Sequence, residues 1–94
     1  MFKQIKKVSE SINNDRSPQD VMCSAMEEVG ELAREVNIEF SNSHKKPGKD
    51  GVVGEIADSI ICLMDLLHIT HPELTEENFS QIIQNKLEKW KRKA

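Results

Sequence analysis

Two short acidic clusters are the residues of this chain best suited to do chemistry. The first, Glu-Glu-Val-Gly-Glu, contains Glu27, Glu28 and Glu31. The second, Glu-Ile-Ala-Asp, contains Glu55 and Asp58. Each cluster holds two carboxylates three residues apart, and on a helix such positions share one face. Two such pairs facing each other would gather four carboxylates around one small volume, where a hard divalent cation is the usual counter-charge.

A solvated helix surface is the simplest explanation of most glutamates on a helix. It suffices for the other helical glutamates, Glu35, Glu39, Glu76, Glu77 and Glu88. It explains Asp58 and Asp65 poorly, because aspartate is a weak helix former and both lie in a strongly apolar run. Buried carboxylates need partners, and Arg34 is the only basic residue within 17–43. Metal ligation is therefore the better account of these aspartates.

The ligand type indicates which metal the clusters would hold. A site made only of carboxylate oxygens suits Mg²⁺, with Mn²⁺ as the alternative. A di-iron site would need Glu-x-x-His pairs, which neither cluster contains. A calcium-buffer module would need an Asp-rich loop of about twelve residues, which is also missing. Magnesium usually shares its coordination with waters and substrate phosphates, so a phosphate substrate and a metal-activated water are expected.

The elements that must position these clusters are helices. The chain has 94 residues, of which 31% are charged and 4% aromatic, and this composition favours one all-α domain spanning residues 1–94. Apolar residues at three- and four-residue spacing predict helices over 2–14, from Ser17-Pro18 to about 40, and over 52–69. Thr75 would cap a fourth helix. Residues 41–51 form the one long loop, and the sequence thus predicts a four-helix bundle.

The apolar faces of the helices predict how they pack. The second helix would pack through a stripe of Met22, Ala25, Met26, Val29, Ala33, Val36 and Phe40. Gly30 interrupts this helix at a cost of about 1 kcal/mol relative to alanine, which indicates a packing or access reason. The inner face of the fourth helix would be Phe79, Ile82, Ile83, Leu87 and Trp90.

The third helix is apolar around most of its circumference, apart from a strip with Glu55, Asp58 and Asp65. Such a helix is normally buried, and one small subunit cannot easily cover it. The sequence therefore predicts that oligomerisation completes the bundle.

Charge and hydropathy restrict the partners and the location. The formal net charge is −3, although the last nine residues carry Lys86, Lys89, Lys91, Arg92 and Lys93. An acidic chain is a poor nonspecific binder of nucleic acid, whereas a basic C-terminal helix would complement a phosphate substrate. No segment reaches the roughly 20 apolar residues of a membrane span, and the N-terminus lacks the apolar run of a signal peptide. We expect a cytoplasmic protein with neither a membrane nor a specific nucleic acid as partner.

The clusters and their surroundings resemble a known enzyme family. Met-Glu-Glu-Val-Gly-Glu-Leu-Ala at 26–33, followed by Gly-Glu-Ile-Ala-Asp at 54–58, is similar to the motif of the MazG-type, all-α nucleoside triphosphate pyrophosphohydrolases. A lysine in the final helix, Lys86, fits too, and the resemblance spans nearly the whole chain. It implies a Mg²⁺-dependent hydrolase that cleaves nucleoside or deoxynucleoside triphosphates between the α- and β-phosphates. The products are the monophosphate and pyrophosphate, which suits house-cleaning of the nucleotide pool.

Carried over by position, the resemblance also implies roles for individual residues. The magnesium ligands would be Glu28, Glu31, Glu55 and Asp58. Glu27 would orient water or neighbouring groups beside the catalytic carboxylates, of which Glu28 is one. The phosphates would be contacted by Lys86, with Lys89, Arg92 and Lys93 behind it. Many relatives have an asparagine four residues beyond the lysine, where this chain has Trp90, which we expect to pack in the core.

The resemblance further implies a homodimer or homotetramer in which neighbouring subunits complete the substrate pocket. Two alternative functions stay open at this point. Phosphoribosyl-ATP pyrophosphohydrolase belongs to the same superfamily and shares the acidic motif and the reaction type. A noncatalytic helical oligomerisation or regulatory module could keep the fold, although the complete set of carboxylates argues against it.

Overall fold

Four α-helices make up the fold in this computed structural model, which describes residues 1–12, 15–41, 45–48 and 51–93. The helices are α1 (Phe2–Ser11), α2 (Pro18–Phe40), α3 (Gly51–Thr70) and α4 (Glu76–Lys93). No strand occurs within the described ranges, so the all-α prediction is confirmed. The first helix ends at Ser11, earlier than the predicted residue 14, and positions 13–14 lie outside the described residues.

Local sequence signals set the helix starts. The Ser17 hydroxyl accepts a hydrogen bond from the backbone N–H of Asp20 at 3.1 Å, which caps α2. The Thr75 hydroxyl accepts one from the backbone N–H of Asn78 at 3.1 Å, which caps α4 as predicted. Gly51, the first residue of α3, has a φ of +65°, a left-handed conformation that glycine adopts at no steric cost.

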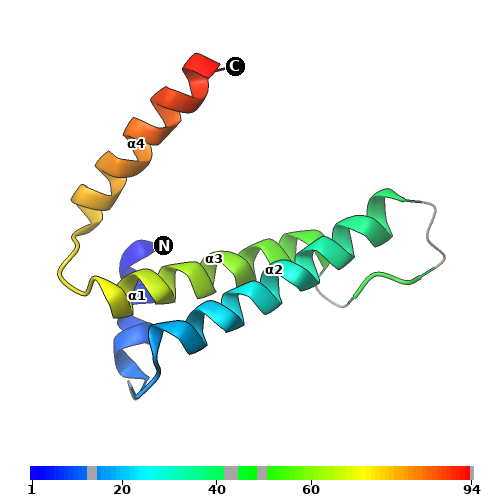
Figure 1. The fold of residues 1–94 in the computed structure, drawn as a ribbon, viewed down its shortest axis with the longest axis horizontal. Helices are drawn as coiled ribbons and strands as arrows, with labels where there is room; N and C mark the ends of the chain where they lie inside the picture. Colours follow the sequence, from blue (N-terminus) through cyan, green and yellow to red (C-terminus); the bar gives the residue numbers. More distant parts are fainter. Residues whose placement is uncertain (13–14, 42–44, 49–50, 94) are drawn as a thin grey trace.

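An antiparallel pair of helices, α2 and α3, forms the body of the chain (Figure 1). The much shorter α1 packs against α3, and α4 extends away from the pair as a separate arm (Figure 1). The first turns of α4 contact α1, where the rings of Phe2 and Phe79 lie 5.8 Å apart and Lys3 pairs with Glu76 at 3.5 Å. A single chain therefore does not close a four-helix bundle.

The side of α2 that faces the rest of the chain differs from the predicted stripe. The buried positions of α2 are Val21, Ala25, Glu35 and Ile38, a set with helical spacing that includes a carboxylate. Except for Ala25, the predicted stripe is exposed, and Phe40 keeps 75% of its surface. The prediction was wrong because α2 turns the face with Glu28, Glu31 and Glu35 inward, so that little of the apolar stripe is covered.

Apolar surface remains exposed on α3 and α4 as well. The buried positions of α3 are Ser59 and His68, and the expected burial of its apolar residues is not achieved within one chain. Trp90 is 71% exposed, so the prediction that it packs in the core is wrong for the isolated chain. No helix among the described residues is long and apolar enough to cross a membrane.

Candidate metal centre

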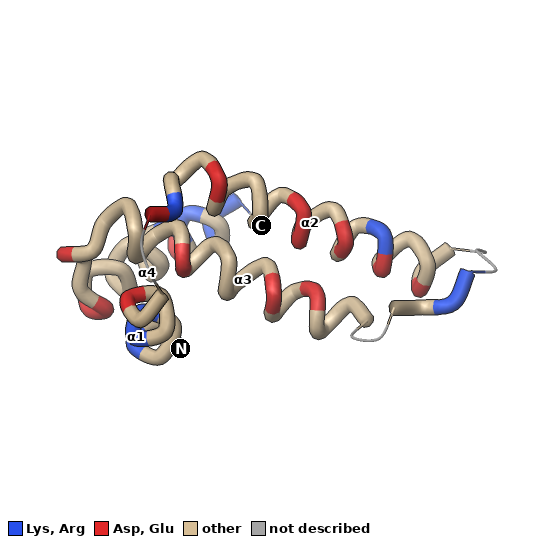
Figure 2. The backbone as a smooth tube through the Cα atoms, turned by 90° about the horizontal axis from the view of Figure 1, so that it is seen from below, with Lys and Arg blue, Asp and Glu red and all other residues tan. Residues whose placement is uncertain are grey.

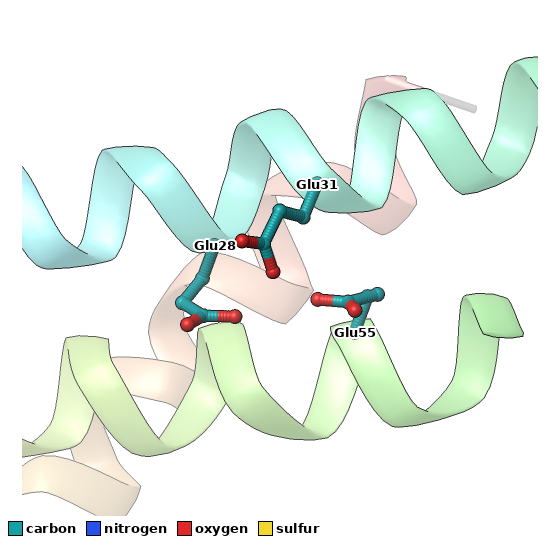
Figure 3. A group of neighbouring side chains, drawn as sticks. All are labelled: Glu28, Glu31 and Glu55. Carbon is teal, nitrogen blue, oxygen red and sulfur yellow. The ribbon is translucent and has the colours of Figure 1, made fainter. Parts of the chain in front are cut away.

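Three carboxylates meet between α2 and α3. Glu28 and Glu31 come from consecutive turns of α2, and Glu55 faces them from α3 (Figure 3). One oxygen from each of the three residues lies within 4.8 Å of the others. Figure 2 shows that acidic positions recur along both helices of this pair. The antiparallel arrangement thus joins the two acidic clusters of the sequence into one site.

Burial and mutual repulsion disfavour three ionised carboxylates in this site without a positive counter-charge. The Oε2 atoms of Glu28 and Glu55 are buried and have no hydrogen-bond partner among the described residues. Burial, followed by the charges of Glu31 and Asp58, raises the pKa of Glu28 above its ordinary value. Burial and the charges of Glu31, Asp58 and Glu28 raise the pKa of Glu55 to about 7.

A bound cation would remove both problems of the cluster. It would pair with the buried oxygens that lack hydrogen-bond partners and neutralise the repulsion between the carboxylates. All the donors are carboxylate oxygens, which Mg²⁺ and Mn²⁺ prefer. The residues present therefore fit a hard divalent cation.

The remaining acidic residues of the two clusters lie at the margin of the site. Asp58 is near enough for its charge to raise the pKa of both Glu28 and Glu55, but its carboxylate is outside the group of three. Its assignment as a ligand stays a prediction. Glu27 is exposed and is the weakest of the causes that shift the pKa of Glu28, and its predicted role in orienting water stays a prediction.

Asp65 does not belong to the metal site, and its interpretation as a metal ligand is wrong. It forms a two-point ion pair with Arg16, at 2.6 and 3.1 Å, and accepts a hydrogen bond from the Ser9 hydroxyl at 2.6 Å. Burial alone would raise the pKa of Asp65, but the hydrogen bonds from Arg16 and Ser9 outweigh it, and the pKa is lowered. The pair was not predicted because Arg16 lies just outside residues 17–43, where Arg34 is the only basic residue.

Glu35 is a second carboxylate that sequence reasoning placed wrongly. Only 3% of its surface is exposed, although a solvated position was expected. Its Oε1 accepts a hydrogen bond from the backbone N–H of Gly48 at 2.7 Å and lies 3.8 Å from the Arg34 guanidinium. The spacing of Glu35 from Val21 and Ala25, at fourteen and ten residues, was the signal that could have revealed its burial.

The predicted phosphate-binding cations are not brought to the cluster within one chain. All of them lie on α4, the arm that leaves the helix pair (Figure 1). They are exposed along that helix: Lys86, Lys89, Arg92 and Lys93. A contact between them and the carboxylates would require another subunit or a different position of α4.

Comparison with known proteins shows that the chain has a relative of similar sequence. The chain is similar to YpjD, an uncharacterized protein of Bacillus subtilis (strain 168). The two sequences are 30% identical over 82 residues, which cover 82% of this chain and 74% of YpjD. No model of a protein family matches the chain, and no solved structure matches it. Its function must therefore be argued from the site itself.

Proposed function

The chain belongs to the same family as YpjD of Bacillus subtilis, and we propose that it is a Mg²⁺-dependent nucleoside triphosphate pyrophosphohydrolase. The observation that carries this proposal is the cluster of Glu28, Glu31 and Glu55, in which the buried Oε2 atoms of Glu28 and Glu55 lack hydrogen-bond partners among the described residues. The similarity of the two acidic runs to the MazG-type motif supports it further. A nucleotide-pool substrate also fits the expected cytoplasmic location.

The three glutamates would hold Mg²⁺, with Asp58 completing the set. When bound, the cation supplies charge stabilisation on the phosphates and lowers the pKa of a coordinated water. Glu27, which is exposed at the edge of the cluster, orients the attacking water. A carboxylate with a raised pKa, such as Glu55, can accept and hold a proton near neutral pH.

A second copy of the chain is the partner that this proposal requires. Apolar side chains of α4 keep between 43% and 71% of their surface exposed within the described residues: Ile82, Ile83, Leu87 and Trp90. Exposed apolar faces of this kind mark interaction sites. In a homodimer or homotetramer, burial of this face would let Lys86 and the basic end of α4 reach the phosphates bound by another subunit.

Pyrophosphate release across a panel of nucleoside triphosphates, deoxynucleoside triphosphates and phosphoribosyl-ATP tests the activity. We expect Mg²⁺-dependent release of pyrophosphate from free nucleotides, and a loss of about 10²–10³-fold in Glu31→Gln or Asp58→Asn. Glu39→Gln, an exposed neutralisation on the same helix, is the matched control and should retain wild-type turnover.

Two results of this assay would overturn the proposal. Hydrolysis of phosphoribosyl-ATP with no turnover of free nucleotides would assign the chain to the alternative enzyme of the superfamily. Absence of turnover on the whole panel, in a protein that is folded and oligomeric, would indicate the noncatalytic module. Equal turnover in Glu31→Gln and wild type would refute the assignment of the metal site.

A further inference from the structure

Segment 45–48 is attached to α2 by a buried carboxylate. Segment 45–48 lies between the end of α2 and the start of α3 (Figure 1). The Oε1 atom of Glu35 accepts the backbone N–H of Gly48 at 2.7 Å. Only 3% of the surface of Glu35 is exposed, and a hydrogen bond shielded from water is stronger than an exposed one, so this contact is well suited to hold the segment in place.

Gly48 is fitted closely to Glu35. A Cβ atom added at Gly48 would lie 2.2 Å from Oε1 and 3.3 Å from the carboxyl carbon of Glu35. A larger residue at position 48 must therefore shift the Glu35 carboxylate from its present place. Glycine is favoured here by this close approach and not by a positive φ, which in the described residues belongs to Gly51.

Both residues of the contact are near residues of the proposed metal centre in the sequence. Glu35 follows Glu31 by four residues, which is about one turn of α2. Gly48 precedes the first residue of α3 by three positions and Glu55 by seven. One hydrogen bond thus connects the helix that carries Glu31 to a residue three positions before the helix that carries Glu55.

Glu35 is not itself part of the ligand cluster. It is outside the group formed by Glu28, Glu31 and Glu55. Its charge is also not among those that raise the pKa of Glu28 and Glu55. Any effect of Glu35 on a bound cation must therefore act through the position of other residues.

We propose that Glu35 is a positioning residue of the metal centre. By holding Gly48, Glu35 fixes the position of α3 along its axis and its rotation about that axis, so that Glu55 lies opposite Glu28 and Glu31. The inference rests on the metal centre of the proposed function. A slip of α3 by one residue would rotate Glu55 by about 100° and shift it by about 1.5 Å. Magnesium demands nearly octahedral geometry at about 2.0–2.1 Å, so it does not tolerate such a displacement.

Binding of Mn²⁺ alone, measured by electron paramagnetic resonance of the free ion, tests this role without any catalytic assay. Glu35→Met removes the acceptor at similar side-chain length. Gly48→Ala shifts the Glu35 carboxylate without mutating Glu35. Both changes should raise the Kd for Mn²⁺ about 10-fold or more, the usual effect of losing a group that orients metal ligands. Glu35→Gln keeps an acceptor oxygen and should stay within about threefold of wild type.

Controls separate positioning from folding. Glu39→Gln removes a carboxylate from the exposed side of α2 and should bind Mn²⁺ like wild type. Circular dichroism melting establishes that each variant is folded at the temperature of the titration. If Glu35→Met does not fold, Gly48→Ala still decides the question, because it changes an exposed residue.

The outcomes distinguish this inference from the proposed function. Wild-type affinity in Gly48→Ala and in folded Glu35→Met, together with weak binding in Glu31→Gln, would overturn the positioning role and leave the metal centre intact. Equal weakening in Glu35→Gln would assign the effect to the charge of Glu35 and also overturn it. Absence of saturable Mn²⁺ binding in wild type would overturn the metal centre and this inference with it.

Discussion

Metal binding should release a proton from Glu55. The pKa of this carboxyl is raised to about 7, first by burial and then by the charges of Glu31, Asp58 and Glu28. A carboxylate must be deprotonated to coordinate a cation, so the proton that Glu55 holds at mildly acidic pH has to leave when the metal enters. Protons and metal therefore compete for the same site, and the metal affinity should fall as the pH is lowered.

The size of the effect follows from the raised pKa. A group with a pKa of about 7 carries about 0.9 proton at pH 6 and about 0.1 proton at pH 8. Binding should release these amounts, and the Kd for Mn²⁺ should be about tenfold higher at pH 6 than at pH 8. The pKa of Glu28 is raised as well, so any contribution from Glu28 increases the release at pH 6.

Isothermal titration calorimetry with Mn²⁺ gives both quantities. Titrations at each pH in two buffers of different ionisation enthalpy yield the number of protons released. Glu55→Gln should bind more weakly and lose most of the dependence on pH, whereas Glu39→Gln should behave like wild type. A release below about 0.2 proton at pH 6 with an unchanged Kd would refute the raised pKa of Glu55 as the source of the coupling.

Three further predictions concern stability. Because the folded pKa of Glu55 lies above its ordinary value of 4.5, the metal-free chain should lose thermal stability as the pH rises from about 4.5 through about 7, and a flat profile would contradict this. Asp65→Asn weakens the pair with Arg16 and should lower the free energy of unfolding in urea by about 1–3 kcal/mol, against no change in Glu39→Gln. Gly30→Ala should raise that free energy by about 0.5–1 kcal/mol, since a Cβ there meets no atom within 4 Å; a decrease would indicate that another copy packs against this position.

Helix positions were the most predictable part of the structure. Ser17 and Thr75 cap α2 and α4 as expected, because a hydroxyl that accepts a backbone N–H is a local interaction encoded within a few residues. The start of α3 was placed within one residue, and the end of α2 at residue 40 as well. Such signals depend on short-range geometry, which the order of the residues determines directly.

The core of the acidic site was also contained in the sequence. Glu28 and Glu31 share a helix face because they are three residues apart, and Glu55 comes from the other apolar helix. The structure brings these three together, while Asp58 lies near them without joining the closest group. The distinction depends on the rotation of α3 about its axis, which spacing within one helix does not specify.

Only the tertiary structure decided the partners of two further carboxylates, the half-buried Asp65 and the buried Glu35. Asp65 is paired with Arg16 across 49 residues of sequence, and Glu35 holds the backbone of Gly48 across 13. The apolar run around Asp65 predicted a metal ligand, and the usual solvation of glutamates on a helix predicted an exposed Glu35, and both predictions were wrong. A buried charge is stabilised by whichever donor the fold carries to it, so its partner follows from how helices are arranged and not from its neighbours in the chain.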